Sequence, residues 1–267
     1  MSAPIVALLT DFGTRDWYAA TLKAVILSRC PRAHIVDITH DIPPQDTLAG
    51  AFTLAAAAPW FPPGAVLLGI VDPGVGTDRA LLAIRADGRY FVGPDNGLLA
   101  LNLVAAKRIR IIRLTQPRYW LKTISRTFEG RDIMAPVAAY LAGGGVLSRL
   151  GVPMGRVTPL ALPTVRRVGA TLRGHVVHLD AFGNLITNLS GELVGAGSAS
   201  RGMVLRYKGR RARVVSSYAA GRPEELIAVV GSLGLIELAV RGASAAWQCT
   251  AARGDEVELV TAPGGRR

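Results

Sequence analysis

The first half of the chain alternates between short apolar runs and amphipathic segments, and this alternation limits the possible fold more than any other feature. Runs typical of strands occupy 5–9, 34–39 and 65–71, and segments with helical periodicity lie between them at 16–30 and 47–58. A helix between successive strands is typical of a parallel sheet with helices on both faces. We therefore expect a mostly parallel, doubly wound α/β domain over residues 1–155.

The pattern changes after residue 155. A proline-bearing stretch at 156–167 is expected to be a linker, and short turn-bounded strands with almost no helix follow it. Strands at such spacing predict a small antiparallel barrel or sandwich. We place this all-β barrel domain at 168–262, with strands expected at 174–179, 203–207, 212–215, 226–230, 236–240 and 256–260.

Composition argues against several classes of protein. No run approaches the ~18 consecutive apolar residues of a membrane-spanning helix. Cys30 and Cys249 are far apart in the sequence and indicate neither a disulfide framework nor a metal site. The chain begins directly with a strand pattern and lacks a basic leader segment, so we expect a cytoplasmic protein with no membrane partner.

The net charge of +12 is unusual and raises the possibility of a nucleic-acid partner. However, the basic residues are spread along the chain, and the densest cluster lies in an expected hairpin at 203–216. Charge on an edge hairpin also deters the addition of another strand. We therefore consider a nucleic-acid partner unlikely and keep a basic nucleic-acid-binding module as an alternative.

Acidic residues follow two of the expected parallel strands. Asp72 comes directly after the run at 65–71 and precedes a Pro/Gly-rich turn, with Arg79 seven residues further on. Asp11 follows the first strand, and its two carboxylate oxygens suit the two hydroxyls of a ribose. Because open α/β sheets bind ligands at the carboxyl ends of their strands, both acids are candidate site residues. The alternatives are that Asp72 caps a turn beside a solvated Arg79 and that Asp11 caps a helix.

The most distinctive stretch of the second domain is 180–188. A heteroaromatic base could stack on Phe182 while the amide of Asn184 pairs with its edge, although Asp180 and Asn184 are also ordinary turn residues. A metal site is not expected, because strand periodicity places His34 and Asp37 on opposite faces.

Six motifs occur in an order that resembles one family: TDFG at 10–13, VDPGVGT at 71–77, PDNG at 94–97, FEGRD at 128–132, DAFGNLITN at 180–188 and GSLG at 231–234. The chain resembles the S-adenosylmethionine (SAM) hydroxide adenosyltransferases, or SAM hydrolases, whose superfamily includes the fluorinase and the chlorinase. This resemblance implies a Rossmann-like N-terminal domain, a C-terminal β-barrel and a homotrimer. It places each site between the N-terminal domain of one subunit and the C-terminal domain of a neighbour.

The resemblance also implies a reaction, in which water or hydroxide attacks the ribose 5′ carbon of SAM and releases adenosine and L-methionine. No cofactor or metal would be needed, since the sulfonium is its own leaving group. Asp11 would bind the ribose hydroxyls. The methionine end and the adenine would be bound by residues of the second domain, namely Asp180, Phe182, Asn184 and Ser232, with Tyr218 packing on the base.

Two departures from the family pattern affect the expected chemistry. The hydrolases carry a histidine where this chain has Glu129, so the expected catalytic set is Asp72, Arg79 and Glu129, with Glu129 sharing the base role through a raised pKa beside Asp72. Fluorinase-type enzymes carry an aromatic residue at Asp72 and a serine at Gly130. A negative charge at Asp72 disfavours halide and favours water. The remaining alternatives are a halogenating enzyme and a SAM- or adenosine-binding protein without catalysis.

Overall fold

The computed structural model describes residues 3–194 and 203–260. The chain divides into two compact units, Met1–Leu160 and Ala161–Arg267, and each is described by itself. Parts of the expected barrel domain, at 195–202 and 261–262, lie outside the described residues. No helix within 3–194 or 203–260 is long and apolar enough to cross a membrane.

The N-terminal unit is built on a seven-stranded sheet with the order β2-β1-β3-β5-β4-β6-β7. Its strands are β1 (Ile5–Thr10), β2 (His34–Thr39), β3 (Val66–Ile70), β4 (Leu81–Ala86), β5 (Arg89–Pro94), β6 (Ile109–Leu114) and β7 (Gly151–Met154). The pairings among β2, β1, β3 and β5 are parallel, whereas β4, β6 and β7 pair antiparallel.

The expectation of a mostly parallel sheet is therefore right for only one half of it. The turn between β4 and β5 consists of Asp87 and Gly88, which both have positive φ, 44° and 89°. Two successive residues in this conformation form the tight turn that joins antiparallel neighbours. The Asp-Gly pair was the signal in the sequence that these two strands form a hairpin.

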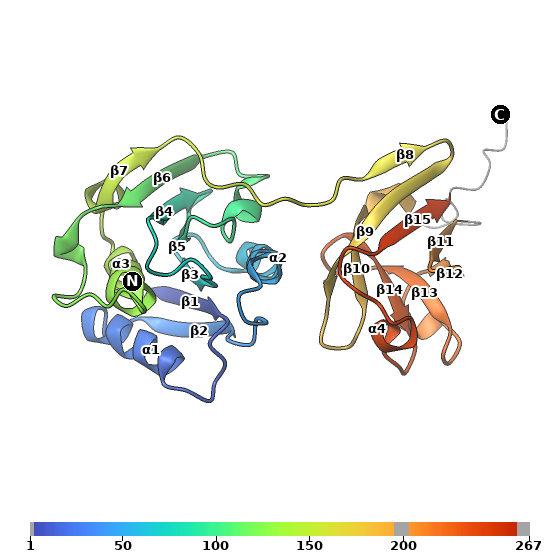
Figure 1. Ribbon diagram of the computed structural model, residues 1–267, viewed down its shortest axis with the longest axis horizontal. Coiled ribbons are helices and arrows are strands. Elements are labelled where there is room, and N and C mark those ends of the chain that lie inside the picture. Colours follow the sequence, from blue (N-terminus) through green and yellow to red (C-terminus); the bar gives the residue numbers. More distant parts are fainter. Residues whose placement is uncertain (1–2, 195–202, 261–267) are drawn as a thin grey trace. The chain divides into compact units, whose positions relative to one another are not determined.

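Helices cover both faces of the sheet (Figure 1). Helices α1 (Tyr18–Arg29) and α3 (Ala135–Ala142) pack on one face, where Leu22 and Ile26 of α1 meet Leu8 of β1. Helix α2 (Thr47–Ala57) packs on the other face, where Leu54 meets Leu9. The buried strands β1 and β3 therefore lie between two apolar layers and can project polar residues only at their ends.

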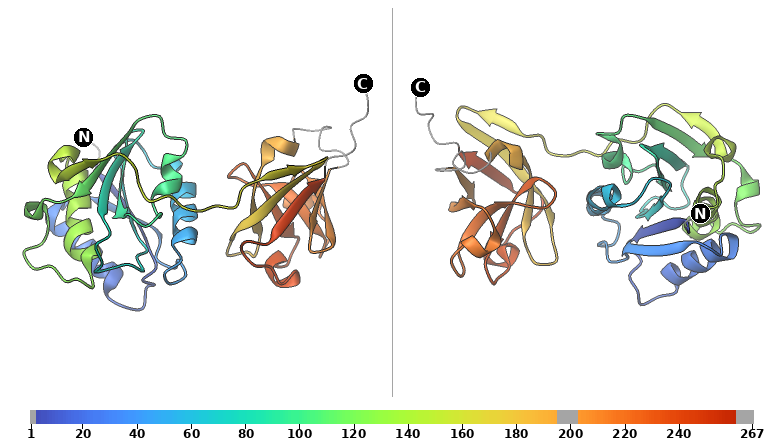
Figure 2. Two further views of the ribbon diagram at one scale, coloured as in Figure 1. Left: turned by 45° about the horizontal axis from the view of Figure 1, so that its top comes forward. Right: turned by 180° about the vertical axis from the view of Figure 1, so that it is seen from behind.

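The C-terminal unit is a closed barrel of seven strands, in the order β10-β14-β13-β12-β11-β15-β9, and the β9–β10 pairing completes the ring. Its strands are β9 (Thr171–Leu179), β10 (Leu185–Ser190), β11 (Val204–Tyr207), β12 (Arg210–Val215), β13 (Leu226–Val230), β14 (Leu235–Val240) and β15 (Glu256–Val260). Figure 2 shows this unit from two further directions. The interior is filled by apolar side chains such as Val176, Leu205 and Ile236, all fully buried.

Two strands of this unit were absent from the sequence expectation. Strand β8 (Arg166–Val168) pairs with β9 outside the ring and begins within the stretch expected to be a linker. Strand β10 begins inside the stretch 180–188, which we interpreted as a base-binding turn, and ends two residues beyond it. A short α-helix, α4 (Ala245–Gln248), precedes β15.

Candidate active site

The two strand-end acids of the N-terminal unit lie close together. Strands β1 and β3 are parallel, and Thr10 is the register partner of Ile70. Asp11 follows Thr10 directly and Asp72 comes two residues after Ile70, and both acids line the same cavity of about 360 Å³. The sequence expectation that both acids belong to one sheet edge therefore agrees with the geometry.

Arg79 folds back over the Pro/Gly turn and binds Asp72 with two nitrogens. Its Nε donates to Asp72 Oδ1 (2.7 Å), and its Nη2 donates to Asp72 Oδ2. The same Nη2 also donates to Glu129 Oε2 (2.6 Å). The side chains of Asp72 and Arg79 are 5% and 9% exposed, so the pair is shielded from solvent and Arg79 is not the solvated residue of the alternative interpretation.

The charge of Arg79 is held firmly. Burial alone would lower the pKa of its guanidinium, but the hydrogen bonds to Asp72 and Glu129 outweigh this effect and raise the pKa. Its Nη1 atom is buried and has no hydrogen-bond partner among the described residues. Arg79 is thus a permanent cation that fixes two carboxylates and retains one free donor.

Glu129 supports this arrangement from outside the cavity. Neither Arg79 nor Glu129 belongs to the residues that line it. Glu129 is followed by a π-helical turn, Gly130–Met134. Such turns occur frequently at functional sites. The geometry favours a role for Glu129 that acts through Arg79 over the expected direct share in the base role.

Gly130 does line the cavity, and a side chain there would not fit the present packing. A Cβ on this residue would lie 2.9 Å from Cδ1 of Ile70, which forms part of the same wall. A serine at this position would therefore require Ile70 to move.

The loop that carries Asp72 and Arg79 is fixed by its neighbours. The side-chain amide of Asn96 donates to the carbonyl of Val71 (2.8 Å), directly before Asp72. Arg126 donates to the carbonyl of Gly76 (2.8 Å), whose φ is +81°. A Cβ at Gly76 would lie 2.8 Å from the backbone oxygen of Arg126, so both space and conformation require glycine here.

Asp11 is held by backbone groups rather than by a cation. Its Oδ2 accepts from the backbone N–H of Gln45 (2.8 Å). Burial raises the pKa of Asp11 and the charge of Asp72 adds to the rise, although backbone N–H groups oppose it. The buried pair Thr10 and His40 fixes the same loop, since Oγ1 of Thr10 lies 2.8 Å from Nδ1 of His40.

Three aromatic rings form a wall of the cavity that the sequence analysis did not single out. Phe12, Tyr18 and Phe128 all line it. The ring centroid of Phe12 lies 5.6 Å from that of Tyr18 and 5.7 Å from that of Phe128. The aromatic positions within TDFG and FEGRD were the available signal. A site with carboxylates and an aromatic wall suits a cationic ligand with flat apolar parts.

In the C-terminal unit, Asp180 and Asn184 bind each other. Oδ1 of Asp180 accepts from the backbone N–H groups of Phe182 and Asn184, and its Oδ2 accepts from Nδ2 of Asn184 (2.8 Å). This turn holds the ring of Phe182 81% exposed. Asp180 and Asn184 therefore do form a turn, and this turn leaves the ring of Phe182 exposed, where a base could stack on it. The two interpretations of this stretch are compatible.

Tyr218 is positioned by a buried carboxylate that the sequence analysis missed. Its hydroxyl donates to Oε2 of Glu237 (2.7 Å), and Glu237 is only 5% exposed. Burial raises the pKa of Glu237, and the charge of Asp180 contributes to the rise, so Asp180 lies near this pair. Burial and the bond to Glu237 raise the pKa of Tyr218 to about 12.

Ser232 is exposed in the turn between β13 and β14. The preceding Gly231 packs directly on the carboxylate of Glu237, since a Cβ there would lie 1.7 Å from Oε1. Asp180, Tyr218 and Gly231, which are distant in sequence, thus gather around Glu237, and Ser232 follows Gly231 directly. A lone glutamate in the apolar run 235–240 was the one sign of this arrangement in the sequence.

Within the described residues, no group of three or more histidine, cysteine or carboxylate side chains could hold a metal ion. His34, considered as a ligand in the sequence analysis, is an exposed residue of β2.

Comparisons with known proteins identify relatives along nearly the whole chain. The family model for the SAM hydroxide adenosyltransferase N-terminal domain matches residues 6–151, and that for the C-terminal domain matches 174–258. A Thermus thermophilus protein named (R)-S-adenosyl-L-methionine hydrolase is 39% identical over 90% of this chain and 93% of its own length. A fluorinase from an Actinoplanes species is 29% identical over 70% of this chain and 72% of its own.

The fold agrees with these matches. The crystal structure of an uncharacterized conserved protein from Thermotoga maritima has a TM-score of 0.90 and 32% sequence identity, and the match covers 96% of this chain and 99% of that one. The fold and the site define a two-domain protein with a strand-end carboxylate site and a closed C-terminal barrel. The chain belongs to the SAM hydroxide adenosyltransferase family, so the resemblance drawn from the six motifs is confirmed.

Proposed function

We propose that this protein hydrolyses SAM to adenosine and L-methionine through in-line attack of water on the ribose 5′ carbon. The observation that carries the proposal is the carboxylate of Asp72, which faces a cavity at a strand end and is fixed by Arg79. Relatives named (R)-S-adenosyl-L-methionine hydrolase support the same reaction. We assign the N-terminal unit to the Rossmann-like folds, and we expect no metal or cofactor to take part.

Asp72 orients the attacking water and accepts its proton. A carboxylate whose two oxygens are both bound by Arg79 has a fixed direction, which reduces the cost of positioning the water. Arg79 itself does not line the cavity and its Nη1 is buried, so it acts through the carboxylate of Asp72. Glu129 is a positioning residue in this scheme, because it touches Arg79 and not the cavity.

Asp11 binds the two ribose hydroxyls with its carboxylate oxygens. The aromatic wall of Phe12, Tyr18 and Phe128 excludes bulk water from the reacting centre and packs against the sulfonium side of the substrate. The negative charge at Asp72 disfavours a halide nucleophile. This favours hydrolysis over the halogenation carried out by the fluorinase-like relatives.

The C-terminal unit supplies the binding surface for adenine and the methionine end. Phe182 and Tyr218 offer ring faces, and Glu237 holds the hydroxyl of Tyr218 so that its ring keeps one orientation. Asp180, Asn184 and Ser232 supply polar contacts. We propose that the protein is a cytoplasmic homotrimer in which the two half-sites of each active site come from neighbouring subunits.

The direct test is to incubate the purified protein with SAM and to follow adenosine and methionine by chromatography, alongside the Asp72→Asn variant. We expect equimolar release of both products and a fall in kcat of about 100-fold or more in the variant, the usual contribution of a general base. Thermal stabilisation by SAM should persist in Asp72→Asn, since the substitution is isosteric. Stabilisation of the wild-type protein without any product would instead show a SAM-binding protein that lacks catalysis.

A further inference from the structure

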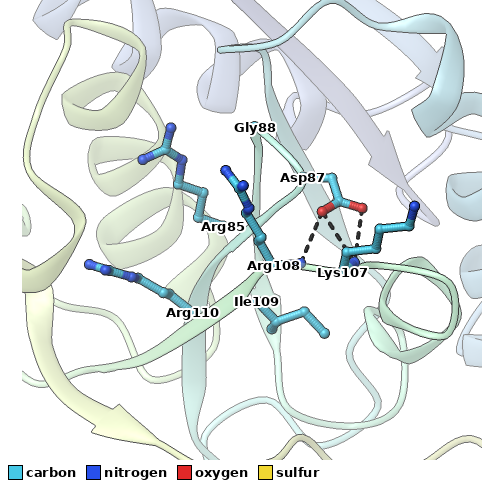
Figure 3. Close-up of a pocket in the computed structure, with 7 residues that line it drawn as sticks. All are labelled: Arg85, Asp87, Gly88, Lys107, Arg108, Ile109 and Arg110. Carbon is cyan, nitrogen blue, oxygen red and sulfur yellow. Dashed lines mark hydrogen bonds between the residues drawn. The ribbon is translucent and has the colours of Figure 1, made fainter.

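A second cavity, of about 960 Å³, lies on the N-terminal unit and is strongly basic. Figure 3 shows its lining residues, which come from the end of β4, the beginning of β6 and the segments beside them. They are Gly88 and six residues with side chains, namely Arg85, Asp87, Lys107, Arg108, Ile109 and Arg110. Four of these six side chains are cationic and one is acidic.

This cavity is separate from the candidate active site. Arg85 is the register partner of Tyr90 in β5, and Tyr90 is the partner of Val66 at the beginning of β3. Asp72 follows the opposite end of β3, six residues further along the chain, or about 20 Å at the rise of a strand. The basic cavity thus lies near the opposite ends of the strands from Asp72, and the proposed reaction does not use it.

The arginines of this cavity carry uncompensated charge. Arg85 lies directly across from Arg110 in the β4–β6 pairing, and like charges in this position destabilise a sheet. No acidic side chain of the described residues forms an ion pair with Arg85, Arg108 or Arg110. Among the residues that the structure describes, the one side-chain partner of these arginines is the ring of Tyr90, whose centroid lies 5.7 Å from Cζ of Arg85.

The single acid of the cavity is already used by the backbone. The carboxylate of Asp87 accepts from the N–H groups of Lys107 (3.1 Å) and Arg108 (3.0 Å), as the dashed lines in Figure 3 mark. Asp87 therefore fixes the segment that carries Lys107 and Arg108 through its backbone, and it does not form an ion pair with the arginine side chains of the cavity. In this view the guanidinium groups of Arg85 and Arg108 point in the same direction, while Arg110 extends to one side.

We propose that this cavity binds a small anion with several linked phosphate groups, either an inorganic polyphosphate or the phosphate chain of a nucleotide. A planar guanidinium binds phosphate with two parallel hydrogen bonds, so three arginines can bind successive phosphate groups. Such an anion also removes the repulsion between Arg85 and Arg110. A nucleic-acid strand fits less well, since the lining contains no aromatic ring on which bases could stack.

Isothermal titration calorimetry with sodium triphosphate tests the proposal on the full chain. We expect saturable binding that weakens about tenfold when NaCl is raised from about 50 mM to about 300 mM. The triple variant Arg85→Gln/Arg108→Gln/Arg110→Gln should lose at least about 100-fold in affinity, since each charge-assisted contact contributes several-fold. All three side chains are exposed, so folding should be retained, which thermal denaturation checks.

The matched control is Arg113→Gln, an exposed arginine of the same strand β6 that points to the opposite face. It should bind triphosphate like the wild type, and so should Asp72→Asn, whose lesion lies in the other cavity. ATP titrated in parallel separates the two sources: equal affinity shows that the phosphate chain alone is recognised, and tighter binding shows a contact to the nucleoside. The proposal is overturned if triphosphate does not bind, if Arg113→Gln weakens binding as much as the triple variant, or if only single-stranded RNA binds.

Discussion

At the scale of single residues, the arrangement of Glu129 leads to a test of how it acts. Glu129→Gln keeps an acceptor for Arg79 but removes the charge, so we expect kcat to fall about tenfold with KM little changed. Because Glu129 lies outside the cavity lining, the acidic limb of the pH–rate profile should keep its position. A shifted limb would show that Glu129 exchanges protons with the water, and unchanged turnover would remove it from the mechanism.

Asp11 offers a second prediction at this scale, because replacing it by asparagine should make the fold more stable and the binding of SAM weaker. Its pKa is raised in the fold by burial, so its favourable contribution is present below the ordinary carboxyl pKa and is lost as the pH rises through the raised value. At neutral pH, Asp11→Asn should therefore raise Tm. The difference should shrink below about pH 4, where the wild-type carboxyl is protonated in both states.

The same Asp11→Asn variant should raise KM for SAM by about 10- to 100-fold, because an amide oxygen replaces a charged acceptor of the ribose hydroxyls. Differential scanning fluorimetry across pH and steady-state kinetics measure the two effects. A variant that is less stable at pH 7, or that binds SAM normally, would contradict the assignment of Asp11.

At the scale of elements, the turn between β9 and β10 depends on one glycine. Gly183 has a φ of +82°, and a Cβ there would lie 2.0 Å from Oγ of Ser244. Gly183→Ala should destabilise the barrel by about 2–4 kcal/mol, through both backbone strain and overpacking. Gly209→Ala is the matched control, since Gly209 also has positive φ (74°) but has no atom within 4 Å of a Cβ.

Urea denaturation followed by circular dichroism would compare the two variants. Gly209→Ala should cost only about 1 kcal/mol, the backbone term alone. Gly183→Ala should also weaken adenosine binding, because the turn presents Phe182 and Asn184. Equal destabilisation by both substitutions would show that the contact with Ser244 relaxes without cost.

Some strands could be predicted from the sequence alone, and others could not. Strands β13 and β15 have the bounds expected from their apolar runs, because these strands are bounded by clear turn residues. Strand β10 was missed because the whole stretch 180–188 was interpreted as one turn on the basis of Asp180 and Asn184. The side chains of Thr187 and Asn188 instead bind backbone groups of the two neighbouring strands of the barrel. Strand β7 contains Pro153, which is tolerated because β7 is an edge strand of its sheet.

The site residues also divide into those that the sequence predicted and those that it did not. Asp72 and Arg79 were legible because an acid at a strand end and a nearby arginine are close in sequence. Glu237 was not, because its partner Tyr218 is brought to it only by the pairing of distant strands. Contacts between residues that are distant in sequence are not visible in local sequence patterns, so the sequence alone can define only part of a site.

At the scale of the whole molecule, the proposed trimer allows a complementation experiment. Asp72→Asn and Asp180→Asn subunits should each be inactive alone. If each site combines an N-terminal unit with a neighbour's C-terminal unit, mixed trimers reassembled from equal amounts should recover about a quarter of the wild-type sites, as a heterologous ring interface requires. Light scattering after size-exclusion chromatography checks that the species is trimeric.

The control is a mixture of Asp72→Asn and Asp11→Asn subunits, which carry both lesions in the same unit. Every site then contains one damaged N-terminal unit, so the mixture should be no more active than the average of the two variants measured separately. Failure of the first mixture to recover, with trimers present, would place the complete site within one subunit.

The β9–β10 and β9–β15 pairings have a consequence for the order of synthesis. Thr171 at the beginning of β9 pairs with Val260 at the end of β15, so the ring closes only after residue 260 has left the ribosome. The N-terminal sheet needs nothing beyond β7 and can form earlier. During translation, a folded first unit therefore precedes a second unit whose strand edges stay open until its last strand arrives, which makes this interval the one most exposed to aggregation.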